Sequence, residues 1–140
     1  MVTTANRLDR LHVRTDAAWA ALDAALARRA VVARAVSSHD AANGGLREAA
    51  DTAESAPRPE REAVENELTR LLAAIDRAVL PDGLAHELTD AELRVVIARR
   101  VHNDAVRDTL GLRRRRKVRY FRLAGSAPAP EFFEIAEPEA

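Results

Sequence analysis

The spacing of apolar residues predicts helices along most of the chain. Residues 5–38 contain neither glycine nor proline, and apolar side chains recur there every three, four or seven to eight positions, at Leu8, Leu11, Ala18, Leu22, Leu26, Ala33 and Val36. This spacing is typical of one face of an amphipathic helix. At about 1.5 Å per residue, the helix would be about 50 Å long. Arg29 lies near the stripe, and we expect its stem to cover apolar surface while its charged end reaches water.

Glycine and proline divide the remaining chain into shorter helical segments. Asn43-Gly44-Gly45 predicts the end of the first helix, and a short helix follows from Leu46 to about Ser55. Pro57 and Pro59 predict a linker and the first turn of a third helix over residues 59–80. The apolar stripe of this helix is the most regular in the chain, with Val64, Leu68, Leu71, Leu72, Ile75 and Val79. Pro81-Asp82-Gly83 predicts its end.

A fourth helix is predicted from a capping pattern and a second stripe. Thr89-Asp90-Ala91-Glu92 has the residue types of a capping box at a helix start. Leu93, Ile97, Val101 and Ala105 are spaced by four and predict the buried face, which Val96 and Val106 widen. Gly111 predicts the end of this helix. We therefore predict an all-α fold, an antiparallel helical bundle of three long helices and one short helix over residues 1–112. An irregular basic and acidic tail would follow over residues 113–140.

Composition supports this fold and excludes several kinds of site. Alanine, the strongest helix former, supplies 30 of the apolar residues, so the helices are expected to approach closely. The absence of cysteine excludes a disulfide scaffold, a thiol enzyme and a CxxC metal site. The histidines at positions 12, 39, 86 and 102 are not spaced to share a helix face, and we expect no metal and no cofactor.

The net charge of zero conceals strong segregation. Residues 1–112 carry 15 arginines and 18 acidic residues, residues 113–122 carry seven basic residues and no acid, and residues 123–140 carry four glutamates. The basic segment (residues 113–122) consists of Arg113, Arg114, Arg115, Arg116, Lys117, Val118, Arg119, Tyr120, Phe121 and Arg122. Anionic lipid head groups or an acidic protein partner would attract it, with the aromatic rings at the membrane interface. Nucleic-acid phosphate is a less favoured partner. Alternatively, Val118 and Phe121 pack on the bundle and the arginines face the acidic tail or the acidic residues between 60 and 67.

No segment has the length or composition of a membrane span. The opening MVTTANRLDR lacks the apolar core of a secretory signal, and the longest run without charged residues is 123–130. A helical span needs about 20 apolar residues. We expect a cytoplasmic protein that is at most peripheral to a membrane.

Four stretches of the chain, in order, carry the residue pattern of a known family. The first runs from Asn6 to Arg29 and includes Asp16-Ala-Ala-Trp19, Leu22-Asp23 and Leu26-Ala-Arg28-Arg29. The others are Glu65-Asn66-Glu67-Leu68-Thr69, Ile97 to Asp108 with Asn103-Asp104-Ala105-Val106, and Glu131-Phe132-Phe133-Glu134. Together they resemble the LemA family, and the resemblance implies an antiparallel helical domain without established enzymatic activity, usually attached to an N-terminal membrane helix. This sequence shows no such helix, has His102 where tyrosine is usual, and has the basic segment where an apolar loop is usual.

The resemblance assigns structural roles to Asp16, Asp23, Arg28, Arg29, Asn103 and Asp104. We expect Asn103 and Asp104 to hydrogen-bond Arg28 or Arg29 between helices. Trp19 lies one position from the centre of its stripe and is expected to pack at the bundle edge, or to anchor a partner.

One short motif favours an alternative function. Arg61-Glu62-Ala63-Val64-Glu65-Asn66 resembles the core of the Nudix box, whose glutamates hold Mg²⁺ against a pyrophosphate. Arg47, Ala53, Asn66 and Leu68 depart from the rest of that motif, and we expect the glutamates instead to complement the positive end of a helix. The sequence therefore favours a non-enzymatic interaction or scaffold domain with an unidentified protein partner. A Mg²⁺-dependent phosphohydrolase and a nucleic-acid-binding protein remain alternatives.

Overall fold

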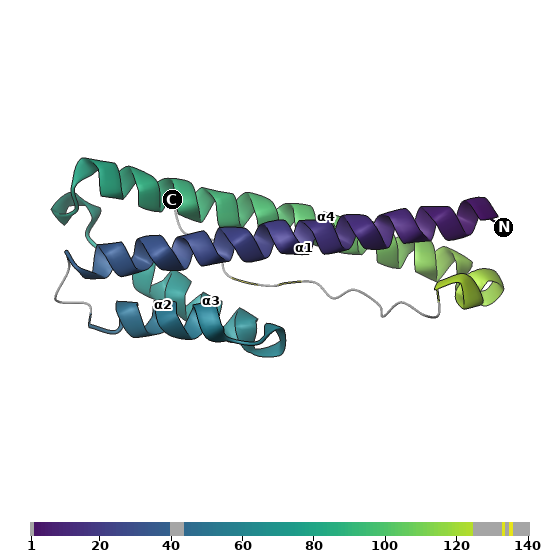
Figure 1. The fold of residues 1–140 in the computed structure, drawn as a ribbon, viewed down its shortest axis with the longest axis horizontal. Helices are drawn as coiled ribbons and strands as arrows, with labels where there is room; N and C mark the ends of the chain where they lie inside the picture. The colour runs from purple at the N-terminus through teal and green to yellow at the C-terminus, as the bar shows by residue number, and fades with distance from the viewer. Residues whose placement is uncertain (1, 40–43, 125–132, 134, 136–140) are drawn as a thin grey trace. The chain divides into compact units, whose positions relative to one another are not determined.

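A computed structural model shows a chain built from helices (Figure 1). It describes the backbone of residues 2–39, 44–124, 133 and 135, and the side chains of these residues apart from 2–6, 8 and 113–124. The elements are α1 (Val2–Ser37), α2 (Leu46–Ser55), α3 (Arg58–Ala73), the 3₁₀ helix η1 (Arg77–Val79) and α4 (Asp82–Ala124). No strand occurs among the described residues, and the predicted all-α bundle of three long helices and one short helix is confirmed.

The chain divides into two compact units, and α1 and α4 contribute to both. Unit 1 consists of Met1–Leu22 and Ala98–Phe133, and unit 2 consists of Asp23–Ile97 and Glu134–Ala140. The division at residue 112 that the sequence suggested stays a prediction.

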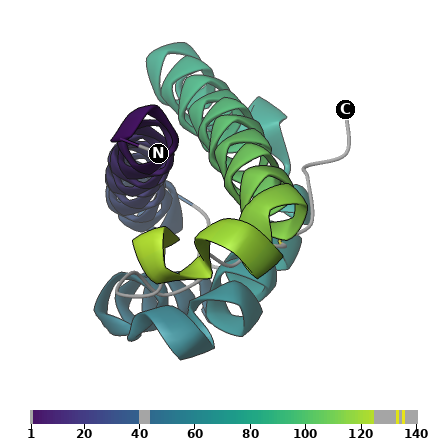
Figure 2. The same cartoon turned by 90° about the vertical axis from the view of Figure 1, so that its right-hand side faces the viewer.

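The core of unit 2 takes side chains from α1, α2, α3, the connection between α3 and α4, and α4. Its buried members are Ala30, Val32, Ala33, Val36, Leu46, Ala50, Ala53, Leu68, Leu72, Ile75, Leu80, Leu88 and Ala91. α2 and α3 lie side by side and are joined through Ala56 and Pro57 (Figure 2). Since alanine has no side chain beyond Cβ, the alanines of α2 allow close approach of the helix backbones. Alanines of α1, α2 and α4 thus form part of this core.

In unit 1, α1 and α4 run antiparallel. Arg14 forms an ion pair with Asp108 at 2.8 Å, and the hydroxyls of Thr15 and Thr109 lie 3.2 Å apart. Further along α1, Trp19 contacts His102, which precedes Thr109 on α4. The numbering therefore rises on one helix as it falls on the other.

The predicted stripe of the first helix is largely confirmed. Ala18, Leu22, Leu26, Ala33 and Val36 are all buried. Leu11 is half-buried, and the side chain of Leu8 lies outside the described residues.

The third helix is shorter than predicted. α3 ends at Ala73, and the side chain of Asp76 then accepts a hydrogen bond from the Ala78 amide at 3.0 Å, which starts η1. Val79 lies in η1 and is exposed, so it is not part of the buried stripe. This aspartate caps a separate short helix, whereas the apolar spacing alone predicted one continuous helix.

The predicted capping box is wrong. α4 begins at Asp82, directly after Pro81, so Thr89 and Glu92 lie inside the helix. Arg77 binds both residues, because its Nη1 atom lies 2.6 Å from an oxygen of Glu92 and donates to the Thr89 hydroxyl at 3.4 Å. These two polar side chains therefore bind an arginine of the preceding element instead of free backbone groups.

The predicted end at Gly111 is also wrong. α4 continues through Gly111 to Ala124. A glycine inside a helix costs about 1 kcal/mol relative to alanine, which a long helix tolerates. The prediction of an irregular segment directly after residue 112 is corrected: residues 113–124 are helical.

The buried face of α4 differs from the apolar stripe that predicted it. Of the stripe residues, Ala105 and Val106 are buried and Val96 is half-buried, whereas Leu93, Ile97 and Val101 are 54%, 52% and 49% exposed. Burial instead recurs every seven residues, at Leu88, Val95, His102 and Thr109, with Ala91, Glu92, Ala105, Val106 and Leu112 beside them. The sequence misled because polar residues occupy several of these buried positions.

Two leucines of α4 test which face of the helix is buried. Leu88→Ala is expected to lower the free energy of unfolding by about 2–5 kcal/mol, because it opens a cavity in the core of unit 2. Leu93→Ala, in the same helix but exposed, is expected to change it by less than about 0.5 kcal/mol. Urea unfolding followed by circular dichroism measures both. A larger loss for Leu93→Ala than for Leu88→Ala would restore the predicted stripe.

Candidate functional site

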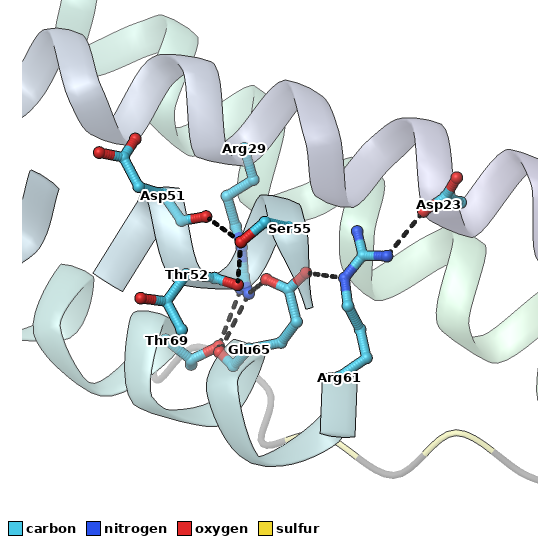
Figure 3. A network of polar contacts seen from close by, with 8 residues as sticks. All are labelled: Asp23, Arg29, Asp51, Thr52, Ser55, Arg61, Glu65 and Thr69. Atoms are coloured by element: carbon cyan, nitrogen blue, oxygen red, sulfur yellow. Dashed lines mark hydrogen bonds and ion pairs between the residues drawn. The ribbon is translucent and has the colours of Figure 1, made fainter. Parts of the chain in front are cut away.

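A network of buried charges joins α1 to α3 inside unit 2 (Figure 3). Arg29 of α1 and Glu65 of α3 are each 1% exposed at the side chain, and Nη2 of Arg29 lies 3.1 Å from Oε1 of Glu65. The same guanidinium donates to the Thr69 hydroxyl at 2.8 Å and to the backbone carbonyl of Glu65 at 3.1 Å. The Arg29 guanidinium thus binds three acceptors of α3, which are the carboxylate and the carbonyl of Glu65 and the hydroxyl of Thr69.

A second arginine completes the network. Nε of Arg61 donates to Oε2 of Glu65 at 2.9 Å, and its Nη1 donates to Oδ1 of Asp23 at 2.8 Å. Both oxygens of Glu65 therefore accept hydrogen bonds from arginines, while Asp23 is half exposed. Arg61 connects the buried carboxylate to one at the surface of α1.

Burial and pairing act differently on the two guanidinium groups. Burial lowers the pKa of Arg29 below the usual arginine value, and the neighbouring Glu65 opposes this without cancelling it. Burial also acts to lower the pKa of Arg61, but hydrogen bonds to Glu65 and Asp23 outweigh it and raise the pKa. Removing a charge from water is costly unless opposite charges and hydrogen bonds compensate it. Glu65 and Asp23 provide this compensation for the two arginines.

The geometry corrects two predictions about these residues. The guanidinium of Arg29 is buried and paired, so Arg29 does not extend its charged end into water. Glu65 does not serve the positive end of a helix, since its partners are arginines. A Mg²⁺ ion at the Nudix-like motif would have to displace them. Within the described residues, no cluster of three or more acidic or histidine side chains could hold a metal ion.

An aromatic cluster in unit 1 surrounds Trp19. The ring of Trp19 lies edge to face with His102, with centroids 5.5 Å apart, and with Phe133, with centroids 5.4 Å apart. Trp19 is half-buried and Phe133 is 3% exposed. Aromatic rings favour such edge-to-face contacts because the positive edge of one ring meets the negative face of the other.

Asn103 binds the backbone of the same phenylalanine. Its Nδ2 donates to the Phe133 carbonyl at 3.0 Å, and its Oδ1 accepts from the Phe133 amide at 2.8 Å. The expected bond from Asn103 to Arg28 or Arg29 is therefore wrong. Asp104 likewise pairs with Arg107, at 2.7 Å on its own helix. No local pattern in the sequence indicates the Phe133 contact, because thirty positions separate the two residues.

The remaining predicted residues are at the surface or outside the described side chains. Asp16 and Arg28 are exposed. The side chains of the basic segment are outside the described residues, as are Phe132 and the acidic tail apart from the positions of Phe133 and Ile135. The alternative in which Val118 and Phe121 pack on the bundle therefore stays a prediction.

Comparison with known protein families, with curated proteins and with solved structures finds no match to this chain. Among the described residues, no helix combines the length and the apolar character that crossing a bilayer requires.

Glu65 provides a direct test of the buried network. Glu65→Gln is expected to lower the free energy of unfolding by about 3–5 kcal/mol, because it leaves the buried charge of Arg29 without its ionic partner. Thermal and urea unfolding measure the loss.

Glu67→Gln is the matched control. Glu67 pairs with Arg70 on the same helix, but both side chains are exposed, so the change is expected to leave the unfolding midpoint almost unchanged. Equal losses for the two variants would show that burial does not set the importance of the Glu65 network.

Proposed function

We propose that this chain is a non-enzymatic, LemA-like helical interaction domain, which its basic segment attracts to anionic membrane surfaces. The observation that carries the membrane part is the continuation of α4 to Ala124. Seven positive charges thus follow one another on a single helix within ten residues, or about 15 Å. A basic residue near an anionic bilayer contributes about 1 kcal/mol, so the segment can retain a domain there without a spanning helix.

The contacts among the LemA-like stretches support the family part of the proposal. Arg29 in the first stretch binds Glu65 and Thr69 in the second. Asn103 in the third stretch binds Phe133 in the fourth, and Trp19 in the first contacts Phe133 too. Residues chosen for their resemblance alone therefore bind one another within each compact unit. This is the behaviour expected of residues that maintain a fold.

The aromatic residues of the segment favour a lipid surface over nucleic acid. Tyr120 and Phe121 lie among the basic residues, with Val118 and Leu123 close in sequence. Aromatic and aliphatic side chains enter the region between head groups and acyl chains while arginines bind the head groups. A cytoplasmic protein held peripherally at the membrane is the location that follows from this proposal.

Vesicle co-sedimentation tests the proposal. Wild-type protein is expected to bind vesicles that contain phosphatidylserine and not vesicles of phosphatidylcholine, and binding should weaken as salt screens the charges. Replacement of Arg113, Arg114, Arg115 and Arg116 by alanine is expected to weaken binding at least about tenfold.

A variant with the same change in net charge is the control. Arg7, Arg10, Arg28 and Arg47 are exposed arginines outside the segment, and their replacement by alanine removes four charges elsewhere. If both variants weakened vesicle binding equally, net charge alone would explain the binding, and this result would contradict the proposal. Duplex DNA binding that is tighter than vesicle binding, and lost in the segment variant, would favour nucleic acid instead.

A further inference from the structure

The contact between Asn103 and Phe133 has the form of peptide recognition. One side-chain amide binds both the N–H and the C=O of a single residue, at 2.8 Å and 3.0 Å. A neighbouring strand offers the same pair of groups to an extended peptide in a sheet. Here the described part of unit 1 has no strand, and the partner is a helix residue of α4. Main-chain bonds of this kind hold a peptide without regard to its side chains.

A second feature selects the side chain. The Phe133 ring is buried and lies edge to face against Trp19, which in turn lies edge to face against His102. Trp19 comes from α1, whereas His102 and Asn103 are adjacent on α4. An aromatic ring therefore enters a site that two helices form, while the amide beside it binds its backbone.

The bound residue is separate from the helices that bind it. Phe133 is nine positions beyond Ala124, the last residue of α4. The intervening sequence, residues 125–132, includes glycine and two prolines. Phe133 is therefore not a part of either helix that binds it.

We propose that Trp19, His102 and Asn103 form a binding site for a peptide segment with an aromatic side chain, and that the chain's own Phe133 is the resident ligand. A peptide of the same kind from another protein molecule can occupy the site when Phe133 leaves it. This proposal does not depend on the basic segment, because Trp19, His102, Asn103 and Phe133 all lie outside residues 113–122.

Phe133 belongs to the same chain as the residues that bind it, so a peptide in solution competes with an intramolecular ligand. The effective concentration of such a ligand is on the order of 1 mM, and a competing peptide must match that concentration or bind more tightly. Removal of the Phe133 ring in the full-length chain should open the site. Trp19 is the only tryptophan of the chain, so its fluorescence reports on the site directly.

The experiment uses full-length Phe133→Ala protein and a synthetic peptide with the sequence of residues 129–137. The peptide is expected to change Trp19 fluorescence in a saturable way below about 1 mM, whereas wild-type protein should respond at least about tenfold more weakly. Matched peptides separate the two adjacent phenylalanines. The Phe132→Ala peptide should bind like the parent, and the Phe133→Ala peptide should bind at least about tenfold more weakly, because it lacks the buried ring.

Asn103→Ala, added to the Phe133→Ala protein, should weaken binding of the parent peptide about tenfold or more through loss of both main-chain bonds. Helix content from circular dichroism must be equal in the compared proteins. Absence of a saturable response up to about 1 mM peptide, or equal binding of the two matched peptides, would overturn the proposal.

A measurement on wild-type protein decides the matter if the variants lose helix content. The Phe133 amide donates to Asn103, so its hydrogen exchange should be at least about tenfold slower than in the free peptide. Exchange at the rate of the free peptide would show that the resident ligand is not bound, and would overturn the proposal independently of any substitution.

Discussion

The buried charge of Arg29 is the constraint on which the packing of unit 2 depends. A guanidinium removed from water requires an anion and further acceptors, and Glu65 and Thr69 of α3 supply them. Because these acceptors lie one helical turn apart, they specify both the rotation of α3 and its position along α1. Arg61 extends the same carboxylate to Asp23. Apolar contacts alone would tolerate small slides and rotations between the helices, whereas this set of donors and acceptors fits one arrangement.

Polar residues specify the packing of α4 in a similar way. Glu92 binds Arg77, Thr109 lies against Thr15, and Asn103 binds Phe133, so three buried polar side chains each have a partner from another element. Each would lose a stabilising hydrogen bond if the helix rotated. As a consequence, Leu93 and Ile97 are exposed, although their side chains are more apolar than those of the buried Glu92, Asn103 and Thr109. The helix is oriented by the need to satisfy polar groups as well as by the burial of apolar area.

The two proposals assign different tasks to different parts of the chain. The basic segment extends α4 and offers charge, which acts over a distance and requires little shape. The site at Trp19 and Asn103 offers directed hydrogen bonds and an aromatic contact, which require a specific ligand. An interaction domain can combine both, since a general attraction to a surface raises the local concentration of the partners that a specific site selects.

The amino-acid sequence by itself determined the helical class, the breaks near Gly44 and Pro57, and the burial of Leu22, Leu26, Leu68 and Leu72, because these follow from local propensity and apolar period. It also indicated Trp19, Arg29 and Asn103 through a resemblance, but it did not indicate which residues they bind. Only the tertiary structure decided that Glu65 neutralises Arg29, that α4 continues through Gly111, and that Asn103 binds Phe133. The physical reason is that a buried polar group is satisfied by whichever partner the fold brings within about 3 Å, and the spacing of residues along the chain does not encode that distance.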